Sequence, residues 1–324
     1  MLVRNEKHRF SRRPVLALIL LVAALSLITI QLPTAHAQNY SDWSAPVSLG
    51  PVINSASQDQ QPAISKDGLS LYFASNRSGG FGGFDMYVSQ RLSEEESWGT
   101  PINLGATVNT TANEGNPAFS RDEHLMFFQS DRPGGLGGVD IWVSQREHTH
   151  DNFDWQAAVN LGAGVNSAAG DQAPSYFENN ETGIPQLYFA SSRAGTLGGL
   201  DIFASEQLID GSFSAPVNIT ELNSVGGDSR PSITHDGLEI FFQSDRAGTT
   251  GGPDLWVSTR ETPVDTWSSP VNLGNTVNTT FIDNNPYVSS DGTMLVFVSD
   301  RPGGFGAQDL YVTTRTKNRG NSGK

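Results

Sequence analysis

Short apolar segments, separated by clusters of Gly, Pro, Asp and Asn, fill the chain from residue 43 to residue 315. Some are apolar at consecutive positions, as in Leu71–Ala74, which is typical of a strand covered on both faces of its sheet. Asp-Gly pairs such as Asp67-Gly68 stand between apolar runs and indicate hairpin turns. No stretch after residue 37 has a helical period. The pattern therefore predicts an all-β fold of short antiparallel strands.

One unit of this pattern recurs five times, and each copy predicts four short strands. The first strands contain a proline: Pro62, Pro117, Pro174, Pro231 and Pro286. The second strands carry a phenylalanine at one register: Phe73, Phe128, Phe189, Phe242 and Phe297. The third strands are centred on an aromatic residue: Tyr87, Trp142, Phe203, Trp256 and Tyr311. The fourth strands follow an aromatic head: Trp43, Trp98, Trp155, Phe213 and Trp267.

The spacing of the aromatic heads indicates the architecture. They lie 55, 57, 58 and 54 residues apart, and a repeat with a period in the fifties signals a propeller or a solenoid. The repeat region begins with a fourth strand, residues 43–50, and ends after a third strand near residue 312. Joining these two ends completes the last blade and leaves only short sheet edges. We therefore predict that residues 38–324 form a five-bladed β-propeller closed by its N-terminal strand, with a flexible polar tail over residues 316–324.

The first 37 residues have the features of a secretory signal peptide. A basic segment that contains Arg12 and Arg13 precedes the apolar run Val15–Ile30, and Ala35-His36-Ala37 is a small-x-small cleavage site. An uncleaved anchor helix is the alternative, although the apolar run is short for a full membrane span. The segment around the two arginines is also similar to a twin-arginine export motif. We therefore expect an exported protein, periplasmic or extracellular, with no stable membrane anchor after cleavage.

Composition narrows the range of partners. Without residues 1–37 the chain has 15 basic and 33 acidic residues, a formal charge of −18, which repels nucleic acid and anionic lipid. The chain contains no cysteine, so an exported form would depend on packing and not on disulfides. We expect no nucleic-acid partner.

Each repeat also carries a Gly-rich loop with an arginine at its start. The arginines are Arg77, Arg132, Arg193, Arg246 and Arg301. The successive patterns Pro-x-apolar-Ser-x-Asp-Gly, apolar-Phe-x-Ser-Asp-Arg and Gly-Gly-x-Asp-apolar-aromatic-Val-Ser resemble the WD40-like repeat of TolB-type propellers over residues 43–315. This resemblance implies an exported or cell-envelope protein that binds proteins or cell-wall material without catalysis.

A second motif, Asn-x4-Asp/Glu-x2-Pro, precedes the first strand of every blade and places one carboxylate and one amide per blade near the mouth of the propeller channel. The carboxylates are Asp59, Glu114, Asp171, Asp228 and Asp283. The amides are Asn54, Asn109, Asn166, Asn223 and Asn278. These ten residues are the candidate ligand-binding residues.

Three interpretations of this ring of polar residues stay open. The arginines are expected to tie neighbouring loops by charge-assisted hydrogen bonds, while the asparagines and acids cap loop backbone. Clustered carboxylates and amide oxygens are also ligands for hard cations, so weak Ca²⁺ binding is a second possibility. A polar ligand on that face is the third. A separate cluster, His148-Thr149-His150-Asp151, has metal-ligand residue types but favours a solvated loop.

Signals for catalysis are weaker. The chain has no Gly-x-Ser-x-Gly elbow and no cysteine nucleophile. Every blade carries a near-equivalent acid, whereas glycoside hydrolysis needs two carboxylates in different environments, and only Glu114 is a Glu among four Asp. Our prediction is therefore an exported, non-catalytic β-propeller that binds a protein or a cell-envelope polymer. The alternative is a carbohydrate-active propeller, lectin-like or a glycoside hydrolase, which exposed aromatics beside acids at one unrepeated pocket would favour.

Overall fold

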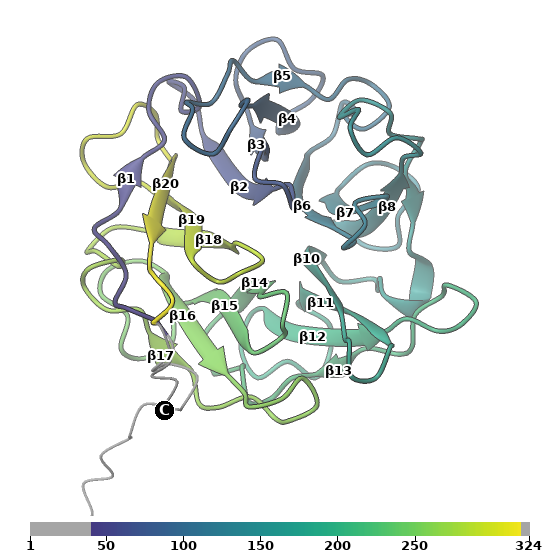
Figure 1. Cartoon of the computed structure of the whole chain (residues 1–324). Coiled ribbons are helices and arrows are strands. Elements are labelled where there is room, and N and C mark those ends of the chain that lie inside the picture. The colour runs from purple at the N-terminus through teal and green to yellow at the C-terminus, as the bar shows by residue number, and fades with distance from the viewer. Residues whose placement is uncertain (1–39, 319–324) are drawn as a thin grey trace, which may run out of the picture. The chain divides into compact units, whose positions relative to one another are not determined.

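The computed structural model describes residues 40–318, so the predicted signal peptide and most of the predicted tail lie outside the described part. The described chain forms five antiparallel sheets of four strands each (Figure 1). A 3₁₀ turn at Gly162–Gly164 is the helical element within this range. No helix within residues 40–318 is both long enough and apolar enough to cross a membrane. The prediction of a five-bladed β-propeller is confirmed.

The innermost strand of each blade is β2 (Asp59–Ile64), β6 (Glu114–Phe119), β10 (Asp171–Glu178), β14 (Asp228–Ile233) or β18 (Asp283–Val288). The second strands are β3 (Ser70–Ser75), β7 (Leu125–Ser130), β11 (Pro185–Ser191), β15 (Glu239–Ser244) and β19 (Met294–Ser299). The third strands are β4 (Asp85–Gln90), β8 (Asp140–Gln145), β12 (Asp201–Glu206), β16 (Asp254–Thr259) and β20 (Asp309–Thr314). The outer strands are β5 (Ile102–Asn103), β9 (Val159–Asn160), β13 (Val217–Asn218), β17 (Val271–Asn272) and β1 (Val47–Ser48).

The five sheets surround a central axis, with β2, β6, β10, β14 and β18 nearest to it (Figure 1). Each inner strand contacts the inner strand of the next blade, and β18 contacts β2, so the ring is complete. Loops 76–84, 131–139, 192–200, 245–253 and 300–308 join second to third strands at one end of the ring, which we call the Gly-loop end. Turns 65–69, 120–124, 179–184, 234–238 and 289–293 join first to second strands at the other end, which we call the hairpin end.

The hydrophobic core is divided among the five interfaces between neighbouring blades. Side chains of a strand alternate between the two faces of its sheet, and both faces are covered in a propeller. Leu71 and Phe73 of β3 therefore pack toward blade five, whereas Tyr72 packs toward blade two. All six residues of β3 are buried, as the doubly apolar sequence predicts. Packing between blades thus provides the stability of a chain without disulfides.

The inner strands share a backbone irregularity that matters for the site. Their pairing with the second strands shifts register at the residue before the blade proline. That residue has a left-handed φ in every blade: Gln61 (59°), Asn116 (51°), Ala173 (54°), Arg230 (57°) and Asn285 (51°). Such a bulge bends the strand and redirects the side chain it carries. Among these five bulge residues, Arg230 is the one with a charged side chain.

Closure of the ring follows the predicted route. Strand β1 pairs with β20 in the order β1-β20-β19-β18, with Val47 opposite Val312. The side chain of Asn54 accepts a hydrogen bond from the Leu310 amide at 2.8 Å and donates one to the Leu310 carbonyl at 3.0 Å. Tyr40 forms an isolated bridge with Lys317, so the first part of the predicted flexible tail pairs with the start of the described chain.

Removal of residues 38–50 tests the closure. We expect the melting temperature to fall and the protein to self-associate, because β20 then presents an unpaired edge and the contact of Trp43 with Phe241 (ring centroids 5.9 Å apart) is lost. Thermal unfolding and size-exclusion chromatography measure both effects. Removal of residues 319–324 is the control. A monomer with the melting temperature of the intact protein would show that β1 is dispensable.

Candidate functional site

The five predicted mouth carboxylates are the first residues of the inner strands, and all five are buried. Asp171 shows the pattern. Its Oδ2 accepts hydrogen bonds from the backbone amide and the hydroxyl of Ser167, at 2.6 and 2.8 Å. Its Oδ1 lies 2.5 Å from a guanidinium nitrogen of Arg193. The equivalent ion pairs are Arg77–Asp59, Arg132–Glu114, Arg246–Asp228 and Arg301–Asp283.

The arginines make further contacts of one kind in every blade. Arg193 donates to the hydroxyl of Ser191 at 2.8 Å and to the carbonyl of Val165 at 2.5 Å. Its guanidinium carbon lies 5.1 Å from the ring centroids of Phe189 and of Phe203, within cation–π range. Equivalent contacts occur around Arg77, Arg132, Arg246 and Arg301. In this geometry each arginine joins neighbouring segments of its blade. Its contribution to the free energy of unfolding stays a prediction.

The five asparagines bind backbone of the preceding blade. Asn166 accepts from the amide of Ile141 at 2.8 Å and donates to its carbonyl at 2.9 Å. Asn54, Asn109, Asn223 and Asn278 make the same pair of bonds. None of the ten predicted ligand-binding residues lines the central cavity described below. Their polar atoms are engaged within the blades, so we place the candidate site elsewhere.

The acidic residues do not converge on a common point. Within residues 40–318, no group of three or more His, Asp or Glu side chains is arranged to hold a metal ion. The His148 ring lies on the surface and pairs with Asp154, with Nδ1 and Oδ2 2.8 Å apart. This hydrogen bond and the charge of Asp154 raise the pKa of His148. The His-rich segment is thus a solvated loop with an ion pair of its own.

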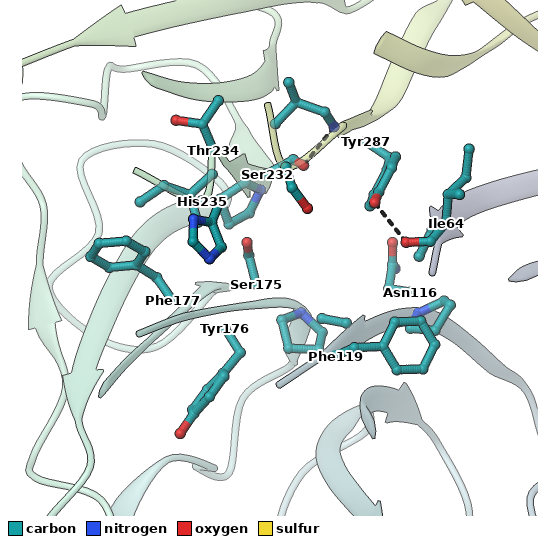
Figure 2. Close-up of a pocket in the computed structure, with 18 of the residues that line it drawn as sticks. Ile64, Asn116, Phe119, Ser175, Tyr176, Phe177, Ser232, Thr234, His235 and Tyr287 are labelled. Carbon is teal, nitrogen blue, oxygen red and sulfur yellow. Dashed lines mark hydrogen bonds between the residues drawn. The ribbon is translucent and has the colours of Figure 1, made fainter. Parts of the chain in front are cut away.

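A cavity of about 150 Å³ lies on the ring axis toward the hairpin end. The five blade prolines line it, together with the ends of the inner strands and the hairpin turns that follow. Figure 2 shows Tyr176 and Phe119 along one side of the pocket, Ser232 and Tyr287 across from them, and Phe177 beside His235. The ring of Tyr176 stacks on Phe127, with centroids 4.7 Å apart, and its hydroxyl donates to Gln207 at 2.7 Å. The hydroxyl of Tyr287 donates to the carbonyl of Ile64 at 2.7 Å. Burial raises the pKa of Tyr287, so its hydroxyl keeps its proton at neutral pH.

The aromatic lining does not follow the five-fold repeat. The residue after the blade proline is Tyr287 in blade five, whereas it is Ala or Ser in the other four. The next residue is aromatic in blades two and three, at Phe119 and Tyr176, and aliphatic in the other three. A blade-building role would require the same residue type in every blade. These side chains therefore form an unrepeated pocket.

Two carboxylates line the same cavity, and their environments differ. Glu123 has a left-handed backbone (φ 59°), accepts from the amide of Lys66 at 2.6 Å and lies 3.5 Å from Arg146. Burial is the largest influence on Glu123 and raises the pKa of its carboxyl. Glu178 accepts from the amide of Arg121 at 2.8 Å, and its second oxygen lies 3.9 Å from the guanidinium of the same residue.

Cationic side chains complete the cavity lining. Lys66 and Arg121 lie in the hairpin turns of blades one and two, and Arg230 lies deeper, on the bulge of β14. Burial, together with the charges of Arg121 and Lys66, lowers the pKa of His235. His235 is therefore largely neutral at physiological pH.

The sequence contained two signals for this site. Blades two and three depart from the Asp-Gly turn, with Arg121-Asp122-Glu123-His124 and the insertion Glu178–Pro185, and such departures are candidates for a specific surface when the repeat is scaffold. The residue before the blade proline also varies, with four residue types in the five blades. Neither signal locates a cavity, because that requires the packing of all five inner strands.

The sequence matches no protein-family model, and no curated protein is significantly similar to it. Solved structures with the same fold include an α-L-arabinofuranosidase from Lactobacillus brevis (14% identity, 84% of this chain and 94% of that chain covered, TM-score 0.57). Another is an α-L-arabinofuranosidase from Podospora anserina in complex with cellotriose (11% identity, 86% and 98% covered, TM-score 0.55). A third is an exo-β-1,3-galactanase from Phanerochaete chrysosporium (15% identity, 83% and 64% covered, TM-score 0.52).

At these identities the likeness establishes the five-bladed propeller fold alone. The similar solved propellers are mostly glycoside hydrolases, which contradicts our prediction of a non-catalytic propeller that binds a protein or envelope polymer. The carbohydrate-active alternative is taken up below as a proposal. A TolB-like structure from Agrobacterium tumefaciens has a TM-score of 0.45 (18% identity, 78% and 73% covered), too low to support the TolB-type resemblance.

Replacement of Arg132 by alanine tests the structural tie. We expect the free energy of unfolding to fall by about 1–3 kcal/mol, because the buried Glu114 carboxylate loses a charged partner 3.2 Å away. Chemical denaturation measures the change. The double variant Arg132→Ala, Glu114→Gln is the matched control and should recover part of the loss, since it leaves no unpaired buried charge. Unchanged stability of the single variant would exclude a structural role.

Proposed function

We propose that this protein is a carbohydrate-active β-propeller whose sugar-binding site is the central cavity at the hairpin end. One observation carries the proposal: two carboxylates in different environments, Glu123 and Glu178, line a single unrepeated cavity with aromatic walls. Aromatic rings provide flat apolar surface, and neighbouring polar groups fix the orientation of a bound ligand. The fold similarity to glycoside hydrolase propellers supports the same class of ligand.

The two carboxylates suit the two roles that glycoside hydrolysis requires. One carboxylic acid protonates the leaving oxygen, and a second carboxylate acts as base or nucleophile at the sugar ring. Glu123 is the proton donor in this proposal, because burial raises its pKa and keeps the proton on it to higher pH. Glu178 is the second carboxylate, since the adjacent Arg121 guanidinium stabilises its negative charge. Loss of activity with rising pH is the expected consequence of the Glu123 assignment.

The size of the cavity restricts the substrate. The cavity has a volume of about 150 Å³. This is smaller than the several hundred Å³ of a typical pocket for a drug-sized ligand. We propose that the cavity receives one terminal sugar unit, with the rest of the glycan outside the hairpin end. Export through a signal peptide at residues 1–37, to the periplasm or the cell exterior, and the TolB-type resemblance of the repeats remain parts of this proposal.

Replacement of Glu123 by glutamine tests the assignment. In a screen of aryl glycosides and oligosaccharides, we expect Glu123→Gln to reduce turnover of the accepted substrate by about 10²- to 10⁴-fold, the usual contribution of a general acid. In Glu123→Gln, kcat/KM should no longer fall as the pH rises, because the titrating acid is absent. Glu178→Gln should also reduce turnover while leaving this limb of the pH profile in place. Rates measured over a pH series separate the two roles.

Glu147→Gln is the matched control, since Glu147 is exposed and does not line the cavity. Its turnover should equal that of the unaltered protein. Sugar binding without turnover would support the lectin-like form of the proposal and remove the hydrolytic assignment. The absence of both binding and turnover, across neutral and acidic glycans, would contradict the proposed function.

A further inference from the structure

Arg230 occupies an unusual place in the ring. It stands on the bulge of β14, directly before Pro231, in a left-handed conformation (φ 57°). Its guanidinium donates to the side-chain oxygen of Asn116 at 3.0 Å. Blades four and two are not neighbours, so this bond passes in front of blade three, where the equivalent residue, Ala173, has only a methyl group. The side chain of Arg230 therefore extends across the inner wall of the cavity that it lines.

The charge of Arg230 is not compensated within the described chain. Each of the five loop arginines has a carboxylate partner, whereas Arg230 forms no ion pair with any of residues 40–318. Burial lowers its pKa to about 10, and no neighbouring charge acts against that shift. The guanidinium is thus still protonated at neutral pH. The side chain of Arg230 is half-buried. A half-buried charge without a counter-charge is less stable than a paired one, so a bound anion would stabilise the folded state.

The rest of the cavity favours an anion as well. Lys66 and Arg121 lie at its mouth, and their charges act together with burial to lower the pKa of His235. The two acids there are occupied, because Glu123 contacts the Lys66 amide and Arg146 while Glu178 contacts Arg121. Arg121 is paired with Glu178, whereas Arg230 has no carboxylate partner among residues 40–318. The positive charge left for a negatively charged ligand group is therefore that of Arg230.

We infer that Arg230 binds the carboxylate of an acidic sugar, a uronic acid unit, at the inner end of the cavity. The guanidinium presents several donors in one plane and matches the two oxygens of a carboxylate. The half-buried side chains of Phe119 and Tyr287 then lie beside the ring of the same sugar unit. This inference rests on the proposed function, which it extends by naming the class of sugar. A free carboxylate anion has the same binding group, and the experiment below separates the two sources.

The test is isothermal titration calorimetry on the unaltered protein and on two variants. The probes are digalacturonate, glucuronate, the neutral sugars galactose and cellobiose, and acetate. We expect a uronate to bind more tightly than acetate and the neutral sugars. Arg230→Gln should weaken uronate binding by roughly 10- to 100-fold, as for the loss of a charged hydrogen bond. Arg230→Lys should show a smaller loss, because it keeps the charge and loses the planar fork.

The glutamine variant is expected to fold. Gln61 occupies the equivalent position of blade one with nearly the same φ, 59°. Because the unpaired charge is removed, the melting temperature of Arg230→Gln should be at least that of the unaltered protein. Uronate should raise the melting temperature of the unaltered protein and leave that of the variant unchanged.

The possible failures can be told apart. Neutral sugars that bind as tightly as uronates, with equal affinity for Arg230→Gln, would overturn the acidic-sugar inference and leave the proposed function standing. Acetate that binds as tightly as the uronates, in an Arg230-dependent manner, would overturn it in favour of a free carboxylate ligand. No binding of any probe would overturn both.

Discussion

The buried ion pair between an arginine and a carboxylate is the interaction on which each blade depends. In blade three the guanidinium of Arg193 joins Asp171 at the start of the inner strand to the carbonyl of Val165, and it stacks against rings from the second and third strands. One side chain thus connects three parts of the blade at the Gly-loop end. A buried pair of this kind is costly to desolvate and very costly to break, so both partners must be present in every blade.

This constraint divides the molecule by end. At the Gly-loop end, every blade uses its carboxylate, arginine and asparagine for construction, and their polar atoms have partners within the protein. The hairpin end also has a repeated tie, because an arginine in four blades binds a hairpin-turn carbonyl and stacks on a tryptophan. The residues that line the cavity at this end, however, differ from blade to blade. Tyr287, Glu123, Glu178 and Arg230 all lie at positions where the blades differ. Because catalysis and selective binding require unlike groups around one ligand, we place the proposed site at the end where the symmetry is broken.

The fold could be predicted from the sequence, because five copies of one pattern gave the strands, the period and the closing strand at residues 43–50. The site could not be predicted in the same way. The spacing around Asp171 located the carboxylates on the inner strands, but it contained no information on burial or on the partner of each oxygen. Arg230 is a sharper case. Its lack of a counter-charge and its reach to Asn116 depend on a backbone bulge and on the small Ala173 of another blade.

A crystal structure of the protein with bound digalacturonate tests the location of the site most directly. The account predicts a sugar ring in the central cavity, beside Phe119 and Tyr287, with its carboxylate on Arg230 and a glycosidic oxygen near Glu123. A ligand bound at the Gly-loop end, above the buried carboxylates, with an empty central cavity, would contradict it.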